Sequence, residues 1–227
     1  MQKLQPVEGD HYPFLTRLSR ALAMFVSYVF HPLFMPVVLL LLLYKLAPIH
    51  FAGMPQGNAF QKGSFFNLLV IVAVCTVLFP LLTILLMKAL GFIKDIEMHD
   101  SKDRIMPLMG IMIFYFWAHH VVSNLPGTPL IVKILLLGSF WNIIAVFMIN
   151  IFFKISMHAV AAGGTLGLVL ALMIVNPINM LPVFYLFLFL AAIIGTARLL
   201  LGAHRRGEVW FGYIVGLVVM FSAYLYI

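Results

Sequence analysis

The sequence predicts an all-α fold, a polytopic bundle of six or seven transmembrane helices whose motif-bearing loops converge on one membrane face. The first observation behind this prediction is the composition: 64% of the 227 residues are hydrophobic and 9% are charged. Soluble domains carry about 25% charged residues, and a soluble fold of this size cannot bury so much apolar surface. The bilayer therefore acts as the solvent for most of the chain.

The second observation is a series of apolar runs, each close to the roughly 20 residues that a membrane helix needs. The first run contains Pro32 and Pro36, which predicts either one kinked span or an interfacial helix followed by a shorter span. Of six or seven spans, we favour seven. The runs form a single transmembrane domain over 21–227, preceded by a polar segment over 1–20. They cover residues 21–45, 65–90, 105–123, 130–153, 159–175, 181–197 and 209–227.

The third observation is where the charge lies. Three connections are rich in charged residues, at 91–107, 152–158 and 197–208. Two predicted spans separate each of these loops from the next, so all three reach the same membrane face. The formal net charge of +7 therefore indicates residues that set the membrane topology or that contact phosphate-bearing headgroups, and not a nucleic-acid partner.

The last charged loop, ARLLLGAHRRGE, contains a candidate nucleophile. His204 and Glu208 are four residues apart, so they share a face if the final helix begins early. A carboxylate bonded to one imidazole nitrogen fixes the tautomer and makes the other nitrogen a better nucleophile or base. Arg198, earlier in the same loop, offers a planar guanidinium that suits phosphate oxygens.

The other two charged loops add cations and a second histidine. Lys154, Ser156 and His158 occur in FFKISMH, and Lys102 and Arg104 occur in KDRIMP. Backbone N–H groups at the start of the helix after FFKISMH can also face an anion. Together these are the groups that phosphoryl transfer needs: cations that hold the phosphate, a nucleophile, and an acid for the leaving group.

These three stretches resemble the motifs of the type 2 phosphatidic acid phosphatase/haloperoxidase family. Five residues separate Arg198 from His204 and three separate His204 from Glu208, as in the third motif of that family (Ser-Arg, five residues, His, three residues, Asp). The stretch ISMH, which ends at His158, is similar to the second motif, Pro-Ser-Gly-His. KDRIMP is similar to the Arg-Pro end of the first motif. The phosphatase-like motifs lie within 97–208, in the family's order.

The resemblance implies a role for each matched residue. His204 corresponds to the nucleophile that forms a phosphohistidine, and Glu208 corresponds to the acid that orients it. His158 corresponds to the acid that protonates the leaving alcohol or phosphate. The family needs no metal, so the resemblance implies no cofactor. The residues that it assigns to the phosphate are Arg198, Arg104 and Ser156, and Lys102 or Lys154 supplies a further cation.

The chain departs from the family's motifs at several positions. Ala197 replaces the serine of the third motif, and Glu208 replaces its aspartate. In the second motif, Ile155 and Met157 replace the proline and the glycine. The lysine of the first motif would fall at Glu97, which carries the opposite charge.

Two other functions remain open. The acidic loop over 95–103 contains Asp95, Glu97, Asp100 and Asp103, which are the kind of ligands that hold Mg²⁺ in a membrane prenyl- or alcohol-phosphotransferase. A non-catalytic lipid-binding or transport protein of the same fold is the other alternative. Metal dependence separates the two enzymes, and turnover separates both enzymes from the non-catalytic protein.

We therefore predict an enzyme, a membrane phosphatase that hydrolyses a lipid phosphate or diphosphate through a phosphohistidine intermediate. Its expected partners are the lipid phosphate substrate and membrane lipids, with no nucleic acid, no metal and no other cofactor. The site lies at headgroup level, where the acyl or prenyl chain of such a substrate can stay in the bilayer. We expect a multi-pass integral protein of a bacterial inner or cell membrane.

Overall fold

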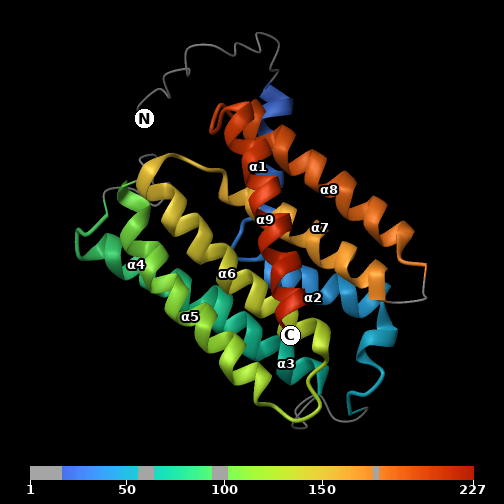
Figure 1. The fold of residues 1–227 in the computed structure, drawn as a ribbon. Coiled ribbons are helices and arrows are strands. Elements are labelled where there is room, and N and C mark those ends of the chain that lie inside the picture. The colour runs from blue at the N-terminus through green and yellow to red at the C-terminus, as the bar shows by residue number, and fades with distance from the viewer. Residues whose placement is uncertain (1–16, 56–63, 94–101, 176–178) are drawn as a thin grey trace.

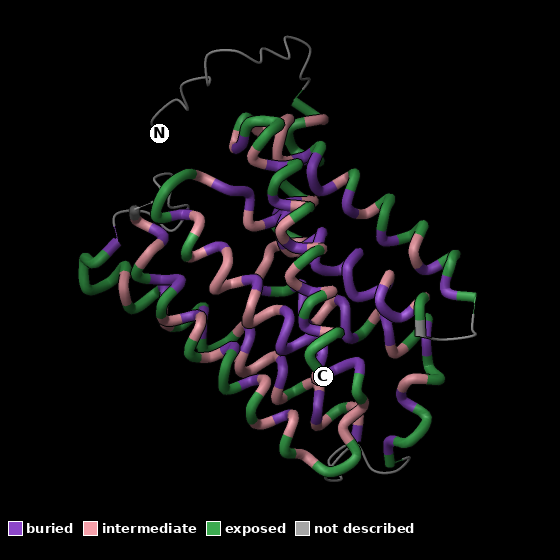
Figure 2. Tube along the Cα trace, viewed as in Figure 1, coloured by how far each residue is buried: buried purple, intermediate pink, exposed green. Residues whose placement is uncertain are grey.

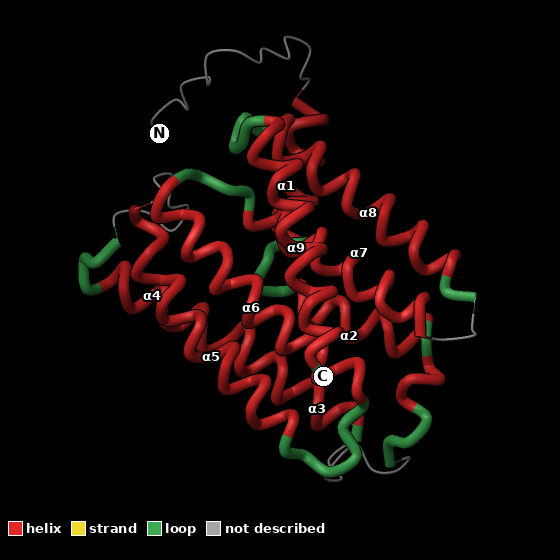
Figure 3. The backbone as a smooth tube through the Cα atoms, in the orientation of Figure 1, coloured by secondary structure: helices red, strands yellow, loops and turns green. Residues whose placement is uncertain are grey.

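The chain is an all-helical, multi-pass integral membrane protein in the computed structural model, which describes residues 17–55, 64–93, 102–175 and 179–227. Figures 1 and 3 show that these parts of the chain form helices and loops and contain no strand. Six of the helices are long and apolar enough to cross a membrane. They are Phe65–Ala89, which comprises α3 (Phe65–Ala73), η2 (Val74–Leu78) and α4 (Phe79–Ala89), then α5 (Ile105–Ser123), α6 (Leu130–Phe152), α7 (Met157–Val175), α8 (Leu181–Leu200) and α9 (Arg206–Tyr226).

The first apolar run forms two short helices, α1 (Arg17–Val29) and α2 (Met35–Leu46). Pro32 lies in the turn between them; it has no backbone N–H, so it favours a break in the helix there. The 12 residues of α2 extend only about 18 Å, against a hydrocarbon core of about 30 Å. Among the described residues the structure therefore gives six helices long enough to span, one fewer than the seven that the sequence favours. Short one-turn helices, η1 (Pro48–Phe51) and η3 (Lys102–Arg104), follow α2 and precede α5.

The first long span contains a wide π-helical turn, η2, between α3 and α4. Pro80, at the start of α4, cannot donate a backbone hydrogen bond, and its ring disfavours a regular turn before it. The Thr76 hydroxyl donates to the carbonyl oxygen of Val72 at 2.9 Å, so this polar side chain is satisfied within its own helix. Thr76 therefore exposes no polar group to lipid beside the π-helical turn.

Helix α7 is the most buried of the six spans, and α9 packs directly against it. Figure 2 shows buried stretches gathered on α7 and on the sides of its neighbours that face it. A Cβ atom added at Gly163 would overlap the carbonyl of Tyr213, and one added at Gly167 would lie 2.5 Å from the carbonyl oxygen of Leu217. The partner numbers rise together, so α7 and α9 run parallel. Glycines allow this approach because membrane helices associate through close backbone packing.

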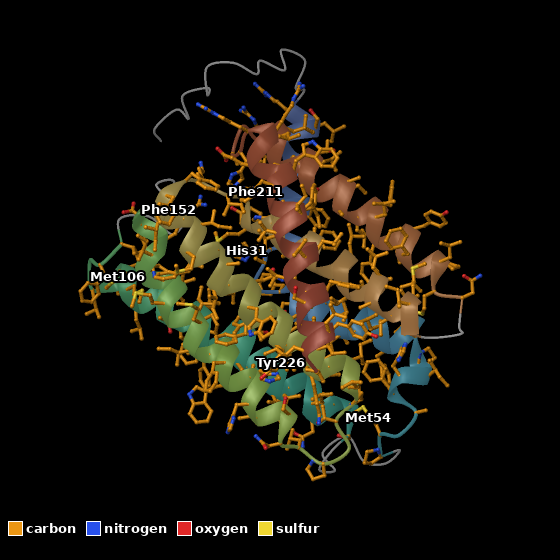
Figure 4. The ribbon with its side chains drawn as sticks, viewed as in Figure 1. His31, Met54, Met106, Phe152, Phe211 and Tyr226 are labelled. Atoms are coloured by element: carbon orange, nitrogen blue, oxygen red, sulfur yellow. The ribbon has the colours of Figure 1, made fainter. Side chains whose placement is uncertain are left out.

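The charged loops meet at one end of the bundle, as their spacing predicts. Helices α5, α7 and α9 begin there, and α4, α6 and α8 end there. In Figure 4, Phe152 and Phe211 lie toward this end, and Tyr226 and Met54 lie toward the opposite end. Phe152 is 79% exposed, which suits an aromatic side chain at the membrane–water interface. The three motif loops therefore share one face of the membrane.

We expect Gly216→Ala to destabilise the protein. A Cβ atom at this position would overlap the carbonyl oxygen of Val160 and crowd the backbone nitrogen of Gly164, so α7 and α9 must separate. Overpacking of this kind costs about 1–3 kcal/mol, which corresponds to an apparent Tm roughly 3–10 °C lower in a protein of this size. Thermal unfolding in detergent measures the shift.

The matched control for this prediction is Gly207→Ala, also in α9. A Cβ atom at Gly207 meets nothing within 4 Å, and alanine favours a helix more than glycine does. This variant should keep or slightly raise the Tm. Equal Tm values for the two variants would contradict the role assigned to the α7–α9 contact.

Candidate active site

His204 and Glu208 form a hydrogen-bonded pair at the start of α9. Gly202 ends the preceding turn with a φ of +63°, a conformation that glycine adopts without strain. His204 then lies just before the helix, and Glu208 lies in its first turn. The Nδ1–H of His204 donates to Oε2 of Glu208 at 2.7 Å. This bond leaves Nε2 of His204 with its lone pair available.

The environment keeps the His204 imidazole neutral near pH 7. Burial lowers the pKa of His204 to about 4, although the hydrogen bond that His204 donates to Glu208 acts in the opposite direction. The positive charges of Arg198 and Lys154 lower it further. A neutral imidazole whose Nδ1–H is held by a carboxylate is the form in which Nε2 acts as a nucleophile or base.

The second charged loop lies directly beside this pair. Ser156 is fully buried; its backbone N–H donates to the carbonyl oxygen of Glu208 at 3.4 Å, and its hydroxyl accepts from the N–H of Ala159 at 3.3 Å. Ser156 therefore caps α7 at the point where α9 begins. His158 follows in the first turn of α7 and is also buried.

Ile155, just before α7, has a clear packing role. Ile155 is fully buried and packs in an apolar cluster with Leu108, Val146 and Val160. An apolar side chain fits this position because it fills the space between α5, α6 and α7. Ile155 therefore anchors the loop in the apolar core directly beside Ser156.

Two parallel helices present their N-termini to the same place. The first N–H groups of a helix lack intrahelical partners, and the aligned peptide dipoles place partial positive charge there. Helices α7 and α9 begin side by side, as the contact between Ser156 and Glu208 shows. Such an arrangement favours an anion at this end of the bundle.

Of the four predicted cations, Arg104, Lys154 and Arg198 can be placed in the site. Arg104 is buried, and its Nη1 donates to the carbonyl oxygen of Ile155 at 3.5 Å. Burial lowers the pKa of its guanidinium, and the charge of Glu208 opposes that shift. The Nη1 of Arg198 donates to the Ser27 hydroxyl at 3.2 Å. Lys154 is half-buried, and its charge acts on His204.

Parts of the predicted first loop lie outside the described residues. Asp95, Glu97 and Asp100 belong to this part, and the Lys102 side chain is likewise outside the description, although its backbone forms η3. Asp103 is half-buried. Among the side chains that the structure does describe, no three His, Cys, Asp or Glu residues group as metal ligands. The metal-dependent alternative therefore stays untested.

Two residues of the α1–α2 segment enter the site, and sequence analysis did not select them. The Nε2–H of His158 donates to the carbonyl oxygen of Ser27 at 3.1 Å. The His31 ring packs edge-on against the His158 ring, with 5.4 Å between centroids, and Figure 4 shows His31 inside the bundle. Burial, with the charge of Arg198, lowers the pKa of His31 to about 4. The available signal was a serine and a histidine four residues apart before Pro32, within an apolar run.

Comparisons of this chain with protein-family models, with curated proteins and with solved structures find no match. The assignment of the site therefore depends on its residues and geometry.

The lowered pKa of His204 gives the stability a defined pH dependence. In the unfolded chain a histidine has a pKa near 6.5, whereas folded His204 binds its proton only near pH 4. Between these values the unfolded state binds more protons, so the free energy of unfolding falls as the pH falls from 6.5 toward 4. We expect His204→Asn to weaken this decline, as measured by apparent Tm in detergent between about pH 7.5 and pH 4.

The wild type is the reference for this measurement, because His31 contributes in the same direction to both proteins. Parallel Tm–pH curves for wild type and variant would show that His204 is not held neutral by the fold.

Proposed function

We propose that this chain is a membrane phosphatase that hydrolyses a lipid phosphate or diphosphate through a phosphohistidine intermediate. The observation that carries the proposal is the buried His204–Glu208 pair, which leaves Nε2 of His204 as a neutral nucleophile. Arg104, Arg198 and the N-termini of α7 and α9 surround this nucleophile with positive charge. A neutral nucleophile in a positive setting suits attack on a phosphate dianion.

In the first step the lone pair on Nε2 of His204 attacks phosphorus. A P–N bond forms and the P–O bond to the leaving lipid alcohol or phosphate breaks. His158 protonates the leaving oxygen, and the carboxylate of Glu208 stabilises the positive charge that develops on His204. Arg198 and Arg104 hold the phosphoryl oxygens, whose charge spreads in the transition state.

In the second step water attacks the phosphohistidine. His158 accepts a proton from the water, the P–N bond breaks, and inorganic phosphate leaves. Nε2 of His204 regains its lone pair, so the enzyme returns to its starting form. The net reaction is ester plus water giving alcohol plus phosphate. No step requires a metal ion, because the arginines and helix termini supply the positive charge.

The position of the site supports a lipid as the substrate. The cluster lies at the end of the bundle that all six described spans reach, where headgroups lie, and Phe30, the neighbour of His31 in the chain, lines a narrow apolar cleft. This cleft continues between α2, α7 and α8 along Met35, Leu39, Ala162 and Phe187. The proposal places the phosphate at His204 and leaves the apolar tail of the lipid in the surrounding bilayer.

The proposed location is a bacterial inner or cell membrane. Such membranes contain helical bundles, whereas bacterial outer-membrane proteins are closed β-barrels. The six apolar helices of this chain support the first kind of membrane. The proposed partners are the lipid phosphate and the surrounding lipids.

We expect His204→Ala to abolish phosphate release. The purified protein in detergent micelles, with EDTA present, should release phosphate from at least one member of a panel of lipid phosphates and diphosphates. Loss of the nucleophile should lower kcat by at least about a thousandfold. A colorimetric phosphate assay measures the release.

The matched control is His120→Ala, because His120 is exposed on α5 near the opposite membrane face. It should keep wild-type activity. Release that EDTA abolishes would favour the metal-dependent phosphotransferase and its acidic loop. Wild-type protein that releases no phosphate from any lipid would leave the binding or transport alternative.

We expect His158→Ala to show a strong dependence on the leaving group. An alkyl lipid phosphate needs a proton on its leaving oxygen, so loss of the acid should lower kcat about 10²–10⁴-fold. p-Nitrophenyl phosphate has a leaving group that departs as an anion, so its kcat should fall less than about tenfold. Steady-state rates with both substrates measure the difference. Equal losses for the two substrates would assign His158 to a different role.

A further inference from the structure

The C-terminal end of α1 brings Ser27 into contact with two of the motif loops. Ser27 is buried, with 8% of its surface exposed. Its hydroxyl accepts from Nη1 of Arg198 at 3.2 Å, and its carbonyl oxygen accepts from Nε2–H of His158 at 3.1 Å. One residue outside the three motifs thus holds a cation of the third motif and the histidine of the second.

The Ser27 carbonyl is available because α1 ends at this point. The last carbonyl groups of a helix lack intrahelical partners. The N–H of His31 bonds to the carbonyl of Tyr28 at 3.3 Å, which tightens the last turn and bypasses Ser27. Pro32 has no N–H to continue the helix. The break between α1 and α2 therefore frees the acceptor that His158 uses.

We propose that Ser27 is a positioning residue of this site, whose carbonyl orients His158 and supports its protonated form while its hydroxyl orients Arg198. The α1–α2 turn then forms a fourth segment of the active site. This inference depends on the proposed phosphatase function, because it assigns a role in the same reaction.

The role of the carbonyl follows from the chemistry of a general acid. To protonate a leaving oxygen, His158 must carry hydrogens on both ring nitrogens and deliver one of them. A carbonyl oxygen only accepts, so the Nε2–H group of His158 keeps its proton and stays hydrogen-bonded to Ser27. Nδ1 of His158 is therefore the nitrogen that exchanges the proton. Ser27 thus serves His158 as Glu208 serves His204, with a neutral acceptor in place of a charged one.

His31 helps to fix this arrangement. Its Nδ1 accepts from the backbone N–H of Leu33 at 3.3 Å, which holds the ring in the turn after α1. The edge-on contact between the His31 and His158 rings limits rotation of His158. The turn therefore constrains the His158 ring through its contact with His31 as well as through Nε2.

The first test removes the hydroxyl. Ser27→Ala should loosen Arg198 and raise KM about tenfold for both an alkyl lipid phosphate and p-nitrophenyl phosphate, with kcat little changed. Ser27→Thr keeps the hydroxyl and should restore KM. The matched control is Ser222→Ala, because the exposed Ser222 hydroxyl donates to the Val218 carbonyl oxygen of its own helix. The KM of this variant should match that of the wild type. A wild-type KM in Ser27→Ala, or a fall in kcat alone, overturns the role of the hydroxyl.

The second test redirects the carbonyl. Pro32→Ala supplies a backbone N–H at position 32 and lets α1 continue through the turn. The backbone N–H of His31 then competes with the His158 side chain for the carbonyl oxygen of Ser27. We expect kcat for the alkyl substrate to fall about tenfold or more and kcat for p-nitrophenyl phosphate to stay near wild type. Pro182→Ala, in the exposed first turn of α8, is the matched control. Equal changes for both substrates, or no change, overturn the role of the carbonyl.

The two proposals fail in different ways. Wild-type protein that releases no phosphate from either substrate overturns the phosphatase function, and this inference fails with it. Wild-type turnover combined with wild-type kinetics in Ser27→Ala and Pro32→Ala overturns only the role of Ser27. Size-exclusion elution and thermal unfolding of each variant confirm that the kinetics describe folded protein.

Discussion

The close parallel contact between α7 and α9 is the constraint on which the rest of the structure depends. Lipid tails are as apolar as helix surfaces, so the two helices gain little from hydrophobic association and must gain from close packing. Gly163 and Gly216 permit that packing, because each lies against a backbone carbonyl of the partner helix. The contact sets the starts of both helices side by side. Ser156 and Glu208 then meet through the backbone, and the two histidine-bearing loops become one site.

The electrostatics of this site combine permanent positive charge with a neutral His204. Arginine stays protonated even when buried, so Arg104 and Arg198 keep an anion-binding potential at any physiological pH. Burial and the charge of Arg198 lower the pKa of both His204 and His31 and so disfavour a proton on either ring. In the reaction that we propose, the arginines hold the phosphate and the neutral His204 attacks it, two roles that a single protonated histidine could not combine.

Much of this arrangement could be predicted from the sequence, and the reason differs from part to part. The spans follow from apolar length, because the bilayer imposes one thickness on every helix. Parity of the spans then predicts the shared face of the loops, and the four-residue spacing predicts the His204–Glu208 pair. The contacts of Ser27 could not be predicted, because its partners His158 and Arg198 lie far away in the sequence. The sequence does not decide whether the first apolar run is one kinked helix or two helices, because a proline in a membrane helix is compatible with a kink or a break.

The order of the helices in the chain has a consequence for assembly. Helix α7 and helix α9 are parallel, so α8 must return across the membrane between them before α9 can insert. During synthesis α7, which follows Ser156 and carries His158 in its first turn, therefore inserts well before its partner α9 has been made. Until the last of these helices inserts, the polar groups at the start of α7 lack the backbone of Glu208, and the glycine face of α7 lacks its cover. Insertion intermediates of this chain therefore contain an incomplete, partly uncovered polar cluster, which a membrane chaperone or a protease that recognises unassembled helices can distinguish from the finished bundle.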